Sequence, residues 1–152
     1  MELWVDVDGT TYLHNTTAAP LSFDGYQIVS ENNRLDPAGW KSISDYVAGG
    51  QIAEVLGNLG AGGLTFGEAN PGPGNLAELN LGGAGTLQAG AKFSIGKPFL
   101  DFNAYLGANA FYKVPGESTA RPMDGAFPEP STWLLAVLAA AGLAVIRRRS
   151  RS

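Results

Sequence analysis

Two aromatic side chains and a carboxylate are spaced so that they share one face of a predicted hairpin. The stretch ELWVDVDGTTYL alternates on both sides of Asp8-Gly9, as two paired strands do. With a three-residue turn, Trp4 lies opposite Tyr12, and Asp6 follows on the same face. This arrangement could stack on a sugar ring and accept hydrogen bonds from its hydroxyl groups. Aromatic pairs across strands also stabilise hairpins without any ligand, so both interpretations stay open.

The patterns that carry catalysis or metal binding are weak. The chain has no cysteine and one histidine, His14, which excludes thiol catalysis, cysteine zinc sites and sites built from several histidines. No Gly-x-Ser-x-Gly motif accompanies His14, and we expect it on the outer face of the second strand. The stretch Asp6–Gly9 resembles the start of a calcium loop, but Thr17 stands where that loop needs a glutamate. The sequence therefore predicts a non-enzymatic protein with no metal and no cofactor.

Charge divides the chain into two unequal parts. Residues 1–126 hold six Lys or Arg and thirteen Asp or Glu, a net charge of −7. Residues 127–152 hold four Arg and one Glu, a net charge of +3. An acidic body repels phosphate backbones, which argues against nucleic acid as a partner.

The elements that must position these residues are predicted to be strands. The chain has 21 glycines and 9 prolines, and short alternating runs recur about every ten residues between turn signals. This spacing is typical of an antiparallel β-sandwich, here predicted over residues 1–115 with little helix, followed by a flexible linker over 116–127. The hairpin register that keeps the faces separate pairs Leu3 with Leu13 and Val5 with Thr11.

Other segments carry weaker predictions. The stretch LSFDGYQIVS is expected to be a third strand with a bulge at Asp24-Gly25. One helical turn is expected to start at Asp36, and GNLGAGG at 57–63 is expected to be a loop. The alternation of Leu100, Phe102 and Ala104 predicts another strand.

The last 26 residues differ from the rest. Pro128 and Pro130 flank Glu129 and keep this segment extended, and Ser131 is a natural helix N-cap. Fourteen residues without charge follow, Trp133–Ile146, and a helix over 131–147 would span about 25 Å. That length is short for a transmembrane helix, which normally needs about twenty residues. The expected membrane contacts are Trp133, Leu134, Leu135, Val137, Leu138, Leu143, Val145 and Ile146. The expected cytoplasmic anchor is Arg147, Arg148, Arg149 and Arg151.

This order of features is similar to the PEP-CTERM sorting signal of Gram-negative bacteria. The resemblance implies that Pro128, Glu129, Pro130 and Ser131 are recognised and processed by an exosortase, a membrane-embedded transpeptidase. It implies a protein that is exported, inserted in the inner membrane, and then displayed on the cell surface or released, in species that export polysaccharide. Such proteins carry an N-terminal signal peptide, and because a strand already begins at Glu2, we expect the true start to lie upstream of Met1.

The body is similar in part to lamin-tail domains, which are immunoglobulin-like sandwiches with binding or structural roles. The resemblance rests on YLHNTTAAPLSFDGYQI and on LQAGAKFSIG. Two further functions remain open: a module that binds exported polysaccharide through Trp4, Tyr12 and Asp6, and a protein permanently anchored by residues 128–152.

Overall fold

The computed structural model describes residues 1–126. The predicted sorting motif, transmembrane helix and Arg cluster lie outside the described residues. Between Met1 and Ala126 no helix has the length and hydropathy needed to cross a membrane. The described part is mainly β, as the sequence predicts, and its strands pair antiparallel except for one parallel pair.

A four-stranded sheet carries the predicted hairpin. Its strand order is β11 (Asp124–Ala126), β1 (Glu2–Val5), β2 (Thr11–His14) and β8 (Lys92–Ser94). Leu3 pairs with Leu13, Trp4 with Tyr12, and Val5 with Thr11, which confirms the predicted register. Gly9 has a φ of 86°, the positive value that this turn requires. The hairpin thus forms as local alternation and turn chemistry dictate.

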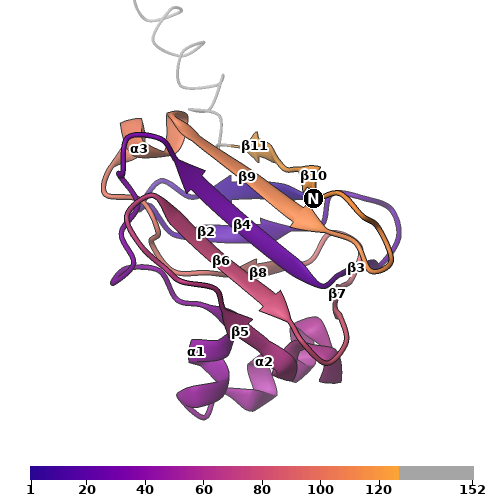
Figure 1. Cartoon of the computed structure of the whole chain (residues 1–152). Helices are drawn as coiled ribbons and strands as arrows, with labels where there is room; N and C mark the ends of the chain where they lie inside the picture. The colour runs from indigo at the N-terminus through magenta and orange to yellow at the C-terminus, as the bar shows by residue number, and fades with distance from the viewer. Residues whose placement is uncertain (127–152) are drawn as a thin grey trace, which may run out of the picture.

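A five-stranded sheet lies in front of the first in Figure 1. Its order is β10 (Arg121–Pro122), β9 (Ala108–Lys113), β4 (Gly25–Ser30), β6 (Asn75–Asn80) and β5 (Phe66–Glu68). A separate two-stranded ladder joins β3 (Leu21–Phe23) to β7 (Gly85–Leu87). Asp24 therefore does not form the expected bulge within one strand. It separates two strands that belong to different sheets, where its backbone N–H donates to Lys113 O.

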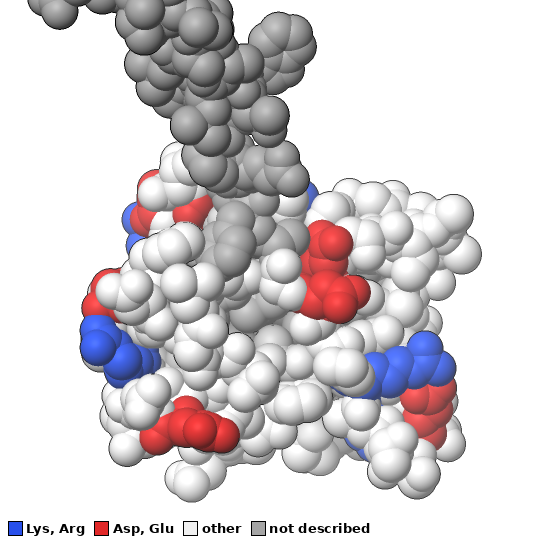
Figure 2. All heavy atoms as spheres, turned by 90° about the horizontal axis from the view of Figure 1, so that it is seen from above, with Lys and Arg blue, Asp and Glu red and all other residues white. Residues whose placement is uncertain are grey.

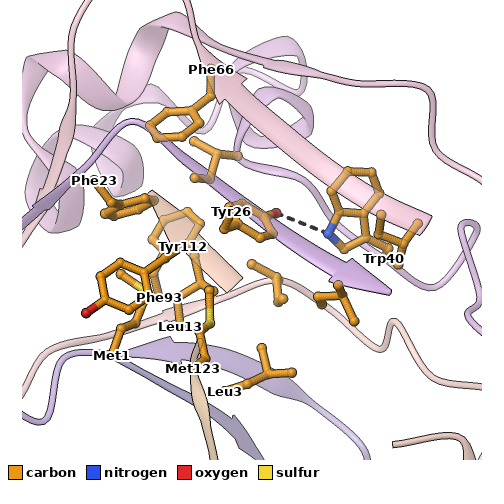
Figure 3. Close-up of a cluster of buried hydrophobic side chains, with 14 of the residues drawn as sticks. Met1, Leu3, Leu13, Phe23, Tyr26, Trp40, Phe66, Phe93, Tyr112 and Met123 are labelled. Carbon is orange, nitrogen blue, oxygen red and sulfur yellow. Dashed lines mark hydrogen bonds between the residues drawn. The ribbon is translucent and has the colours of Figure 1, made fainter. Parts of the chain in front are cut away.

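The hydrophobic core lies between the two larger sheets. Side chains from the four-stranded sheet, among them Leu3, Leu13 and Phe93, meet Tyr26 and Tyr112 from the five-stranded sheet (Figure 3). Leu13 and Phe93 are almost wholly buried, and apolar side chains of this size each contribute about 1.5–3 kcal/mol when buried. Burial of one face of each sheet explains the period-two pattern of the strands.

Three short α-helices and a 3₁₀-helix were not predicted where they occur. The helix α1 (Ile43–Ala48) begins after Ser42, whose side chain accepts from Asp45 N in a capping box. The single turn predicted at Asp36 is present and lies before α1, since Trp40 N donates to Asp36 O at 3.0 Å. The predicted loop at 57–63 overlaps α2 (Ile52–Leu59) and η1 (Ala61–Thr65), which bury Val55 and Leu59. The predicted strand at 100–104 is instead the start of α3 (Phe102–Leu106), capped by Asp101.

The predicted linker over 116–127 is partly strand. Arg121–Pro122 forms β10, which pairs with β9 of the five-stranded sheet. Asp124–Ala126 forms β11, which pairs parallel with β1 of the other sheet. Met123 between them is buried in the core, and burial of its apolar side chain stabilises the folded form of this segment. The folded unit therefore extends beyond residue 115 to Ala126.

The two segments that resemble lamin-tail domains lie side by side. Asn15 is fully buried, and its side-chain amide donates to Ala19 O at 2.8 Å and to Leu87 O and Gln88 O at 3.0 Å. Its Oδ1 accepts from Thr17 N at 3.0 Å. One buried asparagine thus connects the loop after β2 to the turn after β7.

Candidate ligand-binding face

The predicted platform residues lie on the outer face of the four-stranded sheet. The strand register places them in rows that run across the strands. One row holds Glu2, His14 and Lys92, and the next holds Trp4, Tyr12 and Ser94. Asp6 N donates to Thr10 O at 2.8 Å, which places Asp6 one row further along. The structure therefore gathers Trp4, Tyr12 and Asp6 on one face, as the sequence predicts.

Lys92 covers the ring of Trp4. Its Nζ lies 3.7 Å from the centroid of the Trp4 ring and 5.9 Å from that of Tyr12. A cation over an indole ring is stabilised by about 0.5–1 kcal/mol at an exposed site. The edge of Trp4 also meets His14, with ring centroids 6.0 Å apart and planes at 88°. One aromatic surface that a sugar would stack on is therefore already occupied by a cation from β8.

His14 lies on the outer face of β2, as predicted. Its Nδ1 is 3.3 Å from Glu2 Oε2, close enough for an ion pair when the imidazole is protonated. The same Nδ1 is buried and makes no hydrogen bond of good geometry among residues 1–126. His14 faces Trp4 and Glu2, so its described neighbours do not form a Ser-His-Asp arrangement.

The carboxylates of the hairpin turn accept hydrogen bonds from groups within that turn. Asp6 Oδ1 accepts from Val7 N at 2.9 Å. Asp8 accepts from both the N–H and the hydroxyl of Thr10 at 2.9 Å, and these hydrogen bonds lower the pKa of its carboxyl group. Lys97 Nζ lies 3.3 Å from Asp8 Oδ2. Within residues 1–126, no group of three His, Asp or Glu side chains is placed to hold a metal ion. A hairpin turn accounts for these residues.

The sequence analysis missed a buried carboxylate on the other sheet. Glu78 of β6 is 0% exposed. Its Oε2 accepts from Tyr26 Oη at 2.6 Å and from Ile43 N at 2.7 Å, and its Oε1 accepts from Ser44 N at 2.9 Å. Glu78 therefore joins β4, β6 and the first turn of α1. Leu76 and Glu78 are two residues apart and therefore share one face of their strand. Because a leucine at position 76 is expected to face the core, this spacing was the signal that Glu78 points inward.

The network extends to Trp40, whose Nε1 donates to Tyr26 Oη at 3.1 Å (Figure 3). Burial raises the pKa of Glu78, while the hydrogen bonds from Tyr26, Ile43 and Ser44 oppose that shift. Burial also raises the pKa of Tyr26. No solvent reaches the Glu78 carboxylate, so a ligand cannot reach it without local unfolding. We assign Glu78 to the fold and not to a reaction.

The other predicted site residues, from Pro128 to Arg151, lie outside the described residues. No family model, curated protein or solved structure matches the chain. The outer face of the four-stranded sheet thus carries the rings of Trp4 and Tyr12, the Lys92 cation and the carboxylates of Glu2 and Asp6.

Proposed function

We propose that the protein is an exported, non-enzymatic surface or matrix protein whose C-terminal segment directs its sorting. In this proposal an exosortase-like transpeptidase recognises Pro128-Glu129-Pro130, and the apolar stretch Trp133–Ile146 is held temporarily in the inner membrane. The Arg cluster stays in the cytoplasm, by the positive-inside rule. The body then reaches the cell surface or the surrounding matrix of a Gram-negative bacterium.

The observation that carries this proposal is the fixed order of three features in the last 26 residues. A Pro-Glu-Pro motif at 128–130, fourteen uncharged residues at 133–146 and four arginines within 147–151 follow in that order. A short span suits a temporary anchor, since each ångström of mismatch with the bilayer costs a fraction of a kcal/mol. The body supports the proposal in one respect. β11 runs to Ala126, the last residue that the structure describes, so the folded body reaches to within two positions of Pro128.

We infer for the body an immunoglobulin-like or lamin-tail-like sandwich with a binding or structural role. Two sheets on either side of one core support this inference, together with the contact between the two lamin-tail-like segments.

Processing is tested by replacing Glu129 with Ala in the native host. The Glu129→Ala variant should remain in the membrane at full length, whereas the wild type should end near residues 128–131. Glu31→Ala, an exposed carboxylate of the body, is the matched control and should be processed normally. Mass spectrometry of the surface form reads the result. A wild-type chain that retains Arg147–Ser152 would overturn the sorting proposal and favour a permanent tail anchor.

A second candidate function is the binding of exported polysaccharide. It is favoured by one observation, the gathering of Trp4, Tyr12 and Asp6 on one open face. Trp4→Ala should abolish binding to a neutral polysaccharide, because it removes the main stacking ring. Lys92→Ala should strengthen the same binding, because it uncovers that ring.

Affinity electrophoresis in gels that contain the polysaccharide compares these variants. Phe111→Ala, a partly exposed aromatic of the five-stranded sheet, serves as the control and should leave binding unchanged. Equal retardation of Trp4→Ala, Lys92→Ala and the wild type would contradict this function.

A further inference from the structure

Four large apolar side chains near α3 are at least 60% exposed. Val7 is 90% exposed, Leu100 61%, and Phe102 and Leu106 60% each. They belong to the hairpin turn, to the loop before α3 and to α3 itself. Single exposed apolar residues are common, but a contiguous group of them marks a contact surface.

The lining of two neighbouring pockets places these four residues around Tyr105. Val7, Leu100 and Phe102 line one pocket of about 340 Å³. Leu106 and Gly125 line a second pocket of about 250 Å³, and Tyr105 lines both. Phe102 and Leu106 are also four residues apart on one helix, so they share a face of α3. We call Val7, Leu100, Phe102 and Leu106 the α3 patch.

The chain leaves the body at the same end. β11 runs parallel to β1, and Ala126 pairs with Trp4, near the end of β1 that enters the hairpin turn. Gly125 lines a pocket together with Leu106. In Figure 1, α3 and β11 lie together at the top, and α1 and α2 lie at the bottom. Pro128 follows Ala126 by two positions in the sequence, so the described body reaches almost to the motif.

The charges around the patch are largely paired. Asp8 lies 3.3 Å from Lys97, and Arg34 forms an ion pair with Asp101. Asp6 adds one carboxylate at the rim. The part of this end that is visible in Figure 2 is mostly uncharged, with acidic and basic side chains in a few small groups. The end can therefore approach an anionic lipid surface with less repulsion than the net charge of the body suggests.

We propose that the α3 patch is a membrane-contact surface that lies in the headgroup region of the bilayer while residues 133–146 are inserted. This inference rests on the proposed function, because it needs the inserted segment to hold the body close. Apolar side chains of a surface that contacts lipid typically reach about 5–10 Å into the interface. The contact would fix the orientation of the body and place Pro128 at the membrane surface, beside a membrane-embedded enzyme.

The molecule offers a matched control at its other end. Ile52 and Leu56 lie four residues apart on α2 and are 43% exposed each. They are also apolar, but α2 lies opposite α3 and β11 (Figure 1). If lipid contact depends on hydrophobicity alone, Ile52 and Leu56 should contact lipid as well as the α3 patch. If the position where the chain leaves the body sets the contact, only the α3 patch should do so.

The test uses the full chain in vesicles of phosphatidylethanolamine and phosphatidylglycerol. The chain has no cysteine, so Leu100→Cys and Leu56→Cys each allow a single label with an environment-sensitive dye. The dye at Leu100 should shift to shorter emission wavelength and be quenched by brominated lipid. The dye at Leu56 should show neither effect. Val7→Cys provides a second label in the patch should the Leu100 variant fail to fold.

Flotation of the labelled protein with the vesicles separates the two proposals. A chain that floats, with a dye at Leu100 or Val7 in water, would overturn the membrane-contact surface and leave the sorting proposal intact. Equal quenching at Leu56 and Leu100 would also overturn it. A chain that does not float would overturn both the temporary anchor and the contact surface.

Discussion

The two ends of the body differ in which side chains they bury and which they expose. At the α1 end, Glu78 is fully buried and accepts hydrogen bonds from Tyr26, Ile43 and Ser44. At the α3 end, four large apolar side chains that are 60–90% exposed lie beside two pockets, whereas Ile52 and Leu56 on α2 are 43% exposed. Both arrangements cost free energy. A buried carboxylate loses its hydration, and an exposed apolar side chain forgoes the free energy of burial.

This difference indicates separate roles for the two ends. A buried carboxylate is tolerated when its hydrogen bonds fix neighbouring elements, and Glu78 fixes α1 against two strands of the sheet. An exposed apolar group adds little to folding, so its presence is better explained by a contact outside the body. The four predictions below are arranged from the largest expected effect to the smallest.

Removing the buried carboxylate should have the largest effect. Glu78→Ala leaves the Tyr26 hydroxyl and the N–H groups of Ile43 and Ser44 without their acceptor. We expect a loss of about 3–5 kcal/mol in the free energy of unfolding, the cost of breaking a buried charged network. Urea denaturation of the variant and of Glu31→Ala, an exposed control, measures the loss. A loss below about 1 kcal/mol would contradict the assignment of Glu78 to the fold.

Two glycine-to-alanine substitutions should change the stability of the protein in opposite directions. A Cβ at Gly125 would lie 2.5 Å from Tyr105 Oη, so Gly125→Ala should destabilise β11 by about 1–3 kcal/mol. A Cβ at Gly57 meets nothing within 4 Å, and Gly57 lies inside α2. Gly57→Ala should therefore stabilise the protein by up to about 1 kcal/mol. Thermal unfolding of both variants shows whether β11 is fitted as tightly as the structure indicates.

The stability of the α1 end should depend on pH. Because burial raises the pKa of Glu78, the folded protein binds its proton more tightly than the unfolded chain does. This contribution to stability is present below the ordinary pKa, near 4.5, and is lost as the pH rises through the folded-state pKa. Wild-type stability should therefore fall over this range relative to Glu78→Gln, which cannot ionise. Parallel stability curves for the two proteins would show that the folded state leaves the Glu78 pKa unchanged.

Substitutions in the α3 patch should change stability least. Leu100→Ser and Leu106→Ser remove side chains that are already 61% and 60% exposed. We expect changes within about 0.5 kcal/mol, as for most surface positions. Leu76→Ser, at a fully buried leucine of β6, is the contrasting change and should cost several times more. Denaturation curves that show a large loss for Leu100→Ser would mean that the patch supports the fold.

Much of the β structure was predictable because its signals are local. The β1–β2 register follows from alternation and from Asp8-Gly9, which lie within a dozen residues. The helices α1 to α3 were missed because each is shorter than three full turns and lacks a long apolar period. Leu100, Phe102 and Ala104 alternate as a strand would, and over so few residues a helix and a strand have the same pattern. Ser42-x-x-Asp45 was the local signal that marked α1.

The sequence by itself determined the hairpin, the acidic body, and the order of motif, apolar stretch and arginines in residues 128–152. These depend on residue types and on spacing along the chain. The tertiary structure alone decided that Lys92 covers Trp4, that Glu78 lies under α1, and that residues 121–126 join both sheets. Those contacts pair residues tens of positions apart: Glu78 and Ile43, for example, are separated by 35 residues. Such pairs form only when the whole core closes, because burial of the shared apolar surface offsets the entropy of bringing them together.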